Sequence, residues 1–214
     1  MKSPTTPVPL NRKFPYFQKF RRGGVTLRKL VLFIHTSLDS FVAGPKGEID
    51  WIHVDEEIFD YASDRTKASD TALYGRVTYE MMQNYWPTAG AQPNATRHDI
   101  EHSKWYNNVA KVVLSRSLQG LNLPNTTIIG DVKNKVNELK HRQGKDILMF
   151  GSPRAAHALM QLDLVDEYWL FVNPLLLGQG IPLFQSVSET VGLKLDSSHV
   201  FSNGVVCLNY SGRR

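Results

Sequence analysis

The chain has 214 residues but only one cysteine, Cys207, which excludes an internal disulfide and a cysteine-rich zinc site. Long apolar runs are also lacking. The longest are short bursts at residues 30–34 and 175–177, well below the roughly 18 residues that a membrane-spanning helix needs. The first residues have no continuous apolar segment of the kind found in secretory signal peptides. These absences favour a protein of the reducing cytoplasm that does not insert into a membrane.

Acidic residues are missing from positions 1–27, which carry six lysines and arginines. The remaining positions hold 19 basic and 20 acidic residues, so the net charge of +5 comes from the start of the chain. Nucleic-acid binding requires a basic face on the folded domain, and this distribution therefore argues against a nucleic-acid partner. Residues 1–27 show no periodicity and are expected to form a disordered leader. A second hypothesis is that the natural protein starts near Leu27.

Apolar bursts and helical spacing alternate through residues 28–214. Leu30 to Ile34 predict a central strand that is buried on both faces. Shorter bursts predict strands over 71–74, 111–114, 126–129 and 146–150. Helical spacing predicts helices over 55–67 and 77–84, a helix capped by Asp131, and a helix that begins at Pro153 with Ser152 as its cap.

After Leu162 the pattern becomes rich in strands, which are predicted over 167–172, 192–195 and 205–210. The last two are expected to be antiparallel at the edge of the sheet. Together with the earlier alternation, this predicts one α/β domain over residues 28–214, with a mostly parallel central sheet flanked by helices. In such a sheet, ligands bind at the carboxyl ends of the strands.

Three of the predicted strands end in a small residue with a polar neighbour, and these turns are Gly75-Arg76, Ser115-Arg116 and Gly151-Ser152. Glycine lets the backbone approach a phosphate closely, a helix N-terminus offers free N–H donors, and arginine matches phosphate oxygens. One such turn is more often a simple chain reversal. Three along the same sheet indicate a site for a dinucleotide.

Two longer motifs accompany these turns. They are Gly-Arg-Val-Thr-Tyr-Glu at residues 75–80 and Leu-Gly-Gln-Gly-Ile-Pro-Leu-Phe at residues 177–184. With Ser-Leu-Asp at 37–39, Ile-Asp-Trp at 49–51 and Phe-Gly-Ser at 150–152, they follow one another as in the dihydrofolate-reductase superfamily. Over residues 28 to 211 the chain resembles the riboflavin-biosynthesis reductase branch of that superfamily.

This resemblance implies a dihydrofolate-reductase-like fold and an NADPH-dependent reductase that acts on a pyrimidine or pterin-like heterocycle. The family substrate is 5-amino-6-(5-phosphoribosylamino)uracil. It further implies that Gly75, Arg76, Val77 and Thr78 hold cofactor phosphate, that Ser115 and Arg116 lie by the adenosine 2′-phosphate, and that Gly151 and Ser152 support the pyrophosphate. An arginine at the second turn favours NADPH over NADH.

The chain lacks the zinc deaminase domain that precedes the reductase in the two-domain riboflavin enzyme. A different substrate therefore remains open, with folate reduction as one option. A further alternative is a noncatalytic dinucleotide-binding protein that keeps the fold, because fold does not determine function.

Two aspartates are the candidate catalytic residues. Asp55 follows Trp51 as an acid follows a tryptophan in dihydrofolate reductases, and the resemblance suggests that it polarises the substrate. Asp55 could equally cap the helix that starts there. Asp39 is the second candidate, and its alternative role is to close a turn. Ser40 stands where the family has glycine, and serine tolerates a positive φ poorly, so this turn is expected to be rearranged or slightly strained.

Histidines and tryptophans are further candidates for the site. His98 and His102 have helical spacing, but further metal ligands are lacking, so solvent-facing side chains are expected and no metal is assigned. Trp86 and Trp105 could stack on an aromatic substrate, but large aromatic residues usually pack in a core or an interface. The apolar strand at 168–172 could form a homodimer interface or be a buried central strand.

Overall fold

A computed structural model describes residues 27–212, apart from 119, 121, 186 and 188. The predicted leader lies outside the described residues, except for Leu27. No helix in the described part has the length and apolar character needed to cross a membrane.

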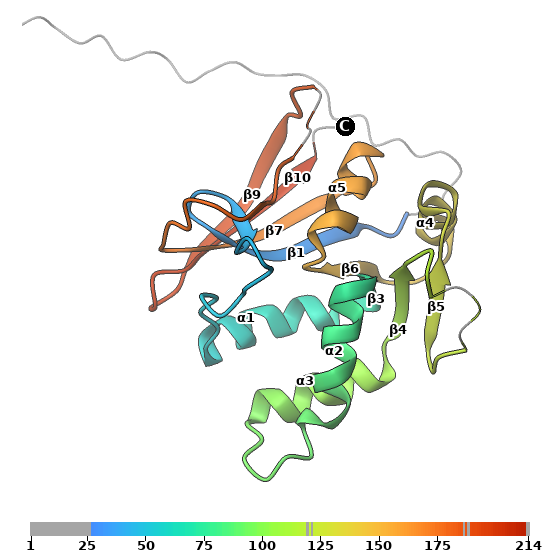
Figure 1. Cartoon of the computed structure of the whole chain (residues 1–214), viewed down its shortest axis with the longest axis horizontal. Helices are drawn as coiled ribbons and strands as arrows, with labels where there is room; N and C mark the ends of the chain where they lie inside the picture. The colour runs from blue at the N-terminus through green and yellow to red at the C-terminus, as the bar shows by residue number, and fades with distance from the viewer. Residues whose placement is uncertain (1–26, 119, 121, 186, 188, 213–214) are drawn as a thin grey trace, which may run out of the picture.

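One eight-stranded sheet runs through the described part in the order β5-β4-β3-β6-β1-β7-β10-β9 (Figure 1). From β5 to β7 all neighbouring strands are parallel, and β10 is antiparallel to both β7 and β9. This confirms the predicted mostly parallel sheet with antiparallel C-terminal strands at its edge. The strands are β1 (Leu30–Ser37), β3 (Ser69–Gly75), β4 (Ala110–Leu114), β5 (Thr126–Ile129), β6 (Asp146–Phe150), β7 (Glu167–Asn173), β9 (Leu193–Val200) and β10 (Val206–Gly212).

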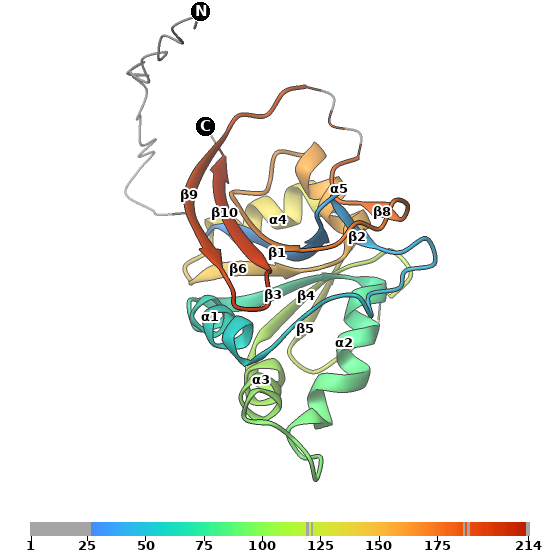
Figure 2. The ribbon, with the colours of Figure 1, turned by 90° about the vertical axis from the view of Figure 1, so that its left-hand side faces the viewer.

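Helices cover both faces of this sheet, as Figure 2 shows. On one face lie α1 (Glu56–Lys67), α2 (Arg76–Ala89) and α3 (Arg97–Asn108), whose side chains share a core with Val31, Phe33 and Phe150. On the other face lie α4 (Val132–His141) and α5 (Pro153–Gln161), which pack against a second core. Because β1 and its neighbours contribute side chains to both cores, apolar residues form most of their sequences.

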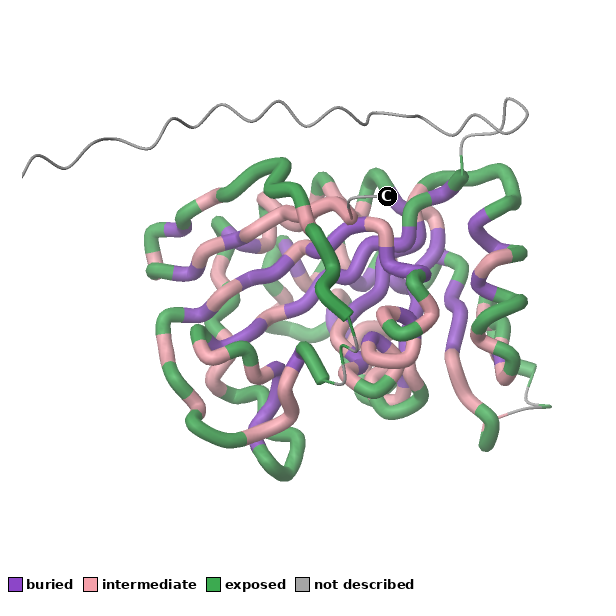
Figure 3. The backbone as a smooth tube through the Cα atoms, turned by 90° about the horizontal axis from the view of Figure 1, so that it is seen from above, coloured by how far each residue is buried: buried purple, intermediate pink, exposed green. Residues whose placement is uncertain are grey.

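Buried residues follow the central strands in Figure 3, and β1 is nearly inaccessible along its length. The strand β7 pairs with β1 on one side and with β10 on the other. This confirms the buried-strand interpretation of residues 168–172, while a homodimer stays a prediction.

A second, two-stranded sheet was not predicted from the sequence. It pairs β2 (Phe41–Ala43) with β8 (Ile181–Pro182). Both strands are too short for a period-2 pattern to show, and β8 contains a proline, which normally argues against a strand. The pairing joins the Ser-Leu-Asp and Leu-Gly-Gln-Gly motifs, which are about 140 residues apart in the chain.

The predicted helix caps are confirmed in two cases and wrong in one. Asp55 and Asp131 each cap their helix by accepting a hydrogen bond from the backbone N–H three residues on. Ser152 occupies the cap position of α5, but its side chain does not bond to the helix. With φ of 60°, Ser152 lies in the left-handed region, and its hydroxyl is directed towards other strands instead.

The turn at Ser40 is strained as expected, because its φ is 66°. We expect Ser40→Gly to stabilise the protein by about 0.5–1 kcal/mol. The relief of a left-handed serine, roughly 1–2 kcal/mol, is partly offset by the larger unfolded-state entropy of glycine. Urea unfolding followed by circular dichroism measures the difference. A loss of stability would show instead that the serine side chain contributes a favourable contact.

Candidate active site

A cavity of about 1610 Å³ opens at the carboxyl ends of the parallel strands. Its lining includes the residues that directly follow β3, β4, β5 and β6, in turns or at helix starts. Cavities that hold one drug-sized ligand usually measure about 300–1,000 Å³. The volume is therefore sufficient for two ligands side by side.

All eight residues predicted to bind a cofactor line this cavity. Three βα turns contribute them, after β3, β4 and β6: Gly75, Arg76, Val77, Thr78, Ser115, Arg116, Gly151 and Ser152. In the sheet, β3 lies between β4 and β6 and is parallel to both. The carboxyl ends of the three strands therefore meet at one edge. The fold thus brings together segments that lie up to 77 residues apart in the chain.

The turns after β3 and β6 are locked together by Ser152. Its hydroxyl accepts a hydrogen bond from the Gly75 N–H at 2.9 Å and donates to the Phe150 carbonyl at 3.1 Å. A Cβ atom at Gly75 would lie 3.3 Å from Ala155 Cβ and 3.4 Å from Ser152 Cβ, which is tighter than ordinary packing. The φ of Gly75 is −80°, which any residue can adopt. Glycine is therefore needed here because it lacks a side chain and allows close approach, not because of its backbone conformation.

Positive charge and free N–H groups gather at this end of the cavity. Both α2 and α5 begin here, and the first backbone N–H groups of a helix have no intrahelical acceptor. Arg76 is held by Glu80, with both N–O distances at 2.9 Å. Within the described residues, Arg116 and Arg154 form no ion pair, although both line the cavity. This end suits an anionic group such as a phosphate.

A second part of the lining, which we call the aromatic lobe, comes from α1, from α2 from Met81 onwards, from α3, and from Phe33, His35 and Phe150. Sequence reasoning left Trp86 and Trp105 out of the site, but both line this lobe. The ring of His102 lies between them, with centroids 4.1 Å from Trp86 and 5.1 Å from Trp105.

The expectation of solvent-facing histidines on α3 is wrong. His98 is buried and stacks on Phe59 at 4.6 Å, and His102 is largely enclosed by the tryptophans. Burial lowers the pKa of His102 to about 4, so its ring is neutral at physiological pH. The spacing of residues 98, 102 and 105 was the available signal, because these positions share one face of a helix.

His35 is a lining residue that the sequence did not single out. It follows the run of apolar residues in β1 and stacks on Phe171 at 4.8 Å. Its Nδ1 atom lies 3.4 Å from the Asn173 amide nitrogen, which is itself fixed by hydrogen bonds to the Thr36 and Phe171 carbonyls. Burial lowers the pKa of His35 to about 4, and the imidazole is therefore neutral.

Asp55 does not line the cavity. One oxygen of its carboxylate accepts from the Ile58 N–H at 3.0 Å, and the other accepts from the Asn203 amide at 2.8 Å. Both oxygens are thus engaged in holding α1 and the turn between β9 and β10. A catalytic role for Asp55 stays a prediction. Its alternative role, capping the helix, is observed.

Asp39 also lies outside the lining residues and fastens the Leu-Gly-Gln-Gly loop. Its carboxylate accepts from the Ser37 hydroxyl at 2.6 Å and from the N–H groups of Leu177 and Gly178 at 3.1 and 2.8 Å. The Ser37 bond first, and then the backbone bonds, hold the pKa of Asp39 below its ordinary value. This arrangement ties the residues after β1 to a loop 138 residues away, which differs from the local turn expected as the alternative to catalysis. A catalytic role for Asp39 stays a prediction.

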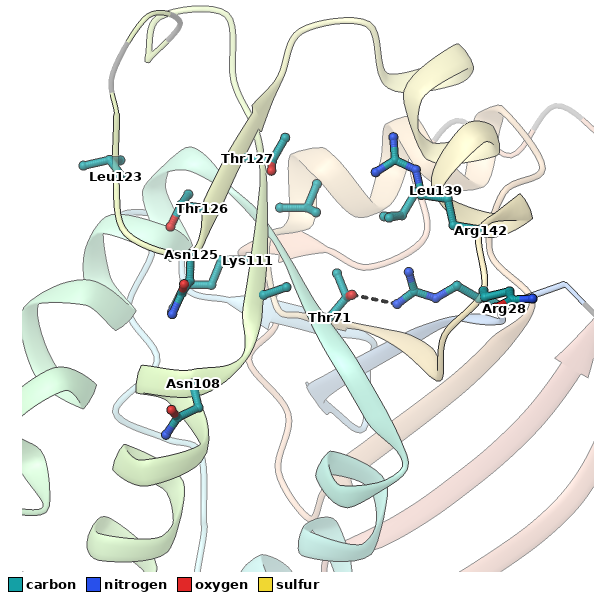
Figure 4. A pocket seen from close by; sticks show the side chains of 13 residues that line it. Arg28, Thr71, Asn108, Lys111, Leu123, Asn125, Thr126, Thr127, Leu139 and Arg142 are labelled. Carbon is teal, nitrogen blue, oxygen red and sulfur yellow. Dashed lines mark hydrogen bonds between the residues drawn. The ribbon is translucent and has the colours of Figure 1, made fainter.

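A second pocket, of about 500 Å³, lies at the opposite edge of the sheet, near the amino ends of β3, β4 and β5 (Figure 4). Its buried arginine, Arg28, already binds the Asp70 carboxylate, the Thr71 hydroxyl at 2.6 Å and the Lys145 carbonyl at 2.6 Å. These bonds tie neighbouring segments together. We therefore take the large cavity as the candidate active site.

Comparison with known proteins identifies the family. The model of the RibD C-terminal domain matches residues 28–207. The chain belongs to the RibD C-terminal domain family. Uncharacterized protein YyaP of Bacillus subtilis (strain 168) is 32% identical over 185 residues, which cover 86% of this chain and 94% of YyaP. The family predicted from the sequence motifs is thereby confirmed, and its members are reductase-like domains.

Solved structures show the same fold at low sequence identity. A pyrimidine reductase-like protein from Corynebacterium diphtheriae is 18% identical with a TM-score of 0.62, covering 87% of this chain and 92% of its own. Dihydrofolate reductase from Enterococcus faecalis, complexed with NADP(H) and RAB-propyl, is 14% identical with a TM-score of 0.57, covering 87% and 97%. These likenesses confirm the dihydrofolate-reductase-like fold of this RibD C-terminal domain.

Proposed function

We propose that this protein is an NADPH-dependent reductase of the riboflavin-biosynthesis type, which acts on a pyrimidine or pterin-like heterocycle. One observation carries the proposal: three βα turns with phosphate-binding character and an aromatic lobe line a single cavity. A dinucleotide and a flat substrate could therefore lie side by side, as hydride transfer requires.

The residues present fit the cofactor. The N-termini of α2 and α5 would hold the pyrophosphate between the turns at 75–78 and 151–154, because the first backbone N–H groups of a helix have no intrahelical acceptor. Arg116 would bind the 2′-phosphate that distinguishes NADPH from NADH. NADPH, when bound, supplies the hydride. The protein holds the substrate and excludes water through the apolar side chains of the aromatic lobe.

Replacing Arg116 by alanine is expected to abolish the preference for NADPH. A hydrogen bond to a charged group contributes about 1.5–3 kcal/mol, which corresponds to a roughly 10- to 100-fold weaker Kd for NADPH. The affinity for NADH should stay within about twofold, because NADH lacks the phosphate. Fluorescence titration of both nucleotides against the wild-type and variant proteins measures the effect.

Arg142→Ala provides the matched control, because Arg142 is an exposed arginine directly after the C-terminal end of α4 that pairs with Glu138 and does not line this cavity. It should leave both Kd values unchanged. If the wild-type protein binds neither nucleotide, the reductase proposal is wrong and only the family and fold stand.

A noncatalytic dinucleotide-binding protein is the second candidate function. The observation that favours it is the structural engagement of Asp39 and Asp55, the two carboxylates predicted to act on the substrate. Turnover decides between the candidates. NADPH oxidation, followed by absorbance with pteridines and aminouracils, should proceed for a reductase and be absent for a binding protein.

Location and assembly are part of the proposal. The free thiol of Cys207 is buried, and burial raises its pKa to about 12, so it is unreactive. A single unpaired cysteine supports a cytoplasmic location. A homodimer stays a prediction, which the molecular mass in solution would test.

A further inference from the structure

The aromatic lobe presents a continuous series of ring contacts across the cavity. From β1 outward, His35 contacts Phe171, which contacts Phe33 at 4.7 Å, and Phe33 contacts Phe150 at 5.6 Å. Phe150 in turn lies 5.6 Å from Trp105. Apart from Phe171, which packs behind them, these side chains line the cavity. Such a wall favours a planar ring that can stack on it.

The lobe has little positive charge to offer an anion. Among its described lining residues, those of α2 beyond Met81 and of α3 include one ionised side chain, Glu101, which is acidic. Arg97, its neighbour on α3, does not line the cavity and pairs with Asp60 at 2.6 Å and Glu101 at 3.6 Å. His35 and His102 are neutral because burial lowers the pKa of each to about 4.

Outside the cofactor turns, two lysines also line the cavity, and both are exposed. Lys67, at the far end of α1, has a side chain that is 71% exposed and lies 3.7 Å from Asp64. Lys46 is exposed in the loop that follows β2. A phosphate placed in the lobe would therefore lose its hydration without gaining a buried cationic partner, which is strongly unfavourable.

His35 supplies a polar contact on the floor of the lobe. Nδ1 lies 3.4 Å from the Asn173 amide nitrogen, which cannot accept a hydrogen bond, so a proton on Nδ1 would have no acceptor there. The orientation of this amide is fixed because its oxygen accepts from the His53 N–H at 3.0 Å. A neutral imidazole that accepts at Nδ1 carries its proton on Nε2. Within the described residues Nε2 has no hydrogen-bond partner, so it is available to a carbonyl oxygen or ring nitrogen.

We propose that the aromatic lobe binds a planar heterocycle without a phosphate group, stacked on Trp105 and hydrogen-bonded by His35. This deepens the proposed function and rests on it, since the lobe is the substrate part of the same cavity. It also separates this protein from reductases of phosphoribosylated substrates. The phosphate-binding capacity of the cavity belongs to the cofactor turns.

The test compares riboflavin with FMN, which differ only by a terminal phosphate. Both are titrated by flavin fluorescence against the full chain saturated with NADP⁺, so that the arginines of the cofactor turns are occupied. We expect riboflavin to bind at least about tenfold more tightly than FMN. Lumazine, a smaller planar heterocycle, should also bind.

Three variants examine the contacts. Trp105→Ala should weaken riboflavin binding roughly 5- to 100-fold through lost stacking, and His35→Phe, which keeps a ring on Phe171, about fivefold through the lost hydrogen bond. The Kd of NADP⁺ should not change in either, which shows that the fold is intact. Glu101→Gln should reduce the discrimination against FMN, whereas Glu138→Gln, on the distant surface of α4, should not.

The outcomes separate the two proposals. FMN binding as tightly as riboflavin, or no binding of riboflavin and lumazine, overturns the inference while leaving an NADPH site in place. If NADP⁺ does not bind, the reductase proposal fails. Riboflavin binding to the free protein that still depends on Trp105 and His35 then upholds the lobe as a heterocycle site.

Discussion

Replacing Gly180 by alanine is expected to destabilise the protein by about 2–4 kcal/mol, a typical range for forced overpacking combined with an unfavourable backbone conformation. Gly180 has φ of 155°, and a Cβ atom built there lies 2.2 Å from the Ala43 carbonyl oxygen. That oxygen belongs to the backbone of β2, so it can move only if the β2–β8 pairing opens. Urea unfolding measures the loss of free energy.

The same change should also weaken ligand binding, because Ala43 and Ile181 on the two paired strands line the cavity. Gly178→Ala is the matched control in the same loop. Its φ is also positive, at 74°, but nothing lies within 4 Å of the added Cβ. It should lose only about 1–2 kcal/mol from backbone strain. Equal losses in the two variants would contradict the steric explanation.

Replacing Lys140 by methionine is expected to lower the free energy of unfolding by about 3–5 kcal/mol, since it breaks a buried ion pair from one side. The Lys140 side chain is 5% exposed, and its ammonium lies 2.6 Å from the Asp166 carboxylate and 3.0 Å from the Leu164 carbonyl. The same carboxylate accepts the Leu30 N–H at 2.8 Å, so the pair fastens α4 to the start of β1.

The double variant Lys140→Met with Asp166→Asn should recover much of this loss, because neither buried charge then lacks its partner. Lys135→Met serves as the control on the same helix. Lys135 is exposed and pairs with Glu138 at 2.9 Å, and such surface pairs contribute about 0–1 kcal/mol. Chemical denaturation of all four proteins tests the prediction. A small effect of Lys140→Met would show that the carboxylate is well hydrated.

The main elements of the fold could be predicted because local pattern and tertiary environment agree. The first five residues of β1 are apolar without alternation because side chains on both of its faces are buried, and β5 was predicted with its observed ends, 126–129. Asp131 signalled the start of α4 through a local hydrogen bond. The β2–β8 sheet escaped prediction, since it depends on contacts between distant segments and not on local pattern.

The candidate site was predicted unevenly for a related reason. The phosphate turns are local signals, each contained within a few residues after a strand. The aromatic lobe is assembled from three helices and two strands, and nothing near Trp86 or Trp105 in the sequence indicates that they face one cavity. The candidate aspartates, Asp39 and Asp55, misled for a different reason. The sequence around an aspartate before a helix is the same whether its side chain caps the helix or takes part in catalysis.

By itself, the sequence determined the parallel sheet and the three turns at its carboxyl edge, because periodicity and turn chemistry depend on neighbouring residues. The family followed from the resemblance of its motifs to those of a known family. Tertiary structure alone decided which side chains meet. It directs the Asp39 carboxylate to the N–H groups of Leu177 and Gly178, the Ser152 hydroxyl to Gly75, and His102 between two tryptophans. These contacts depend on packing between segments far apart in the chain, which local pattern does not encode.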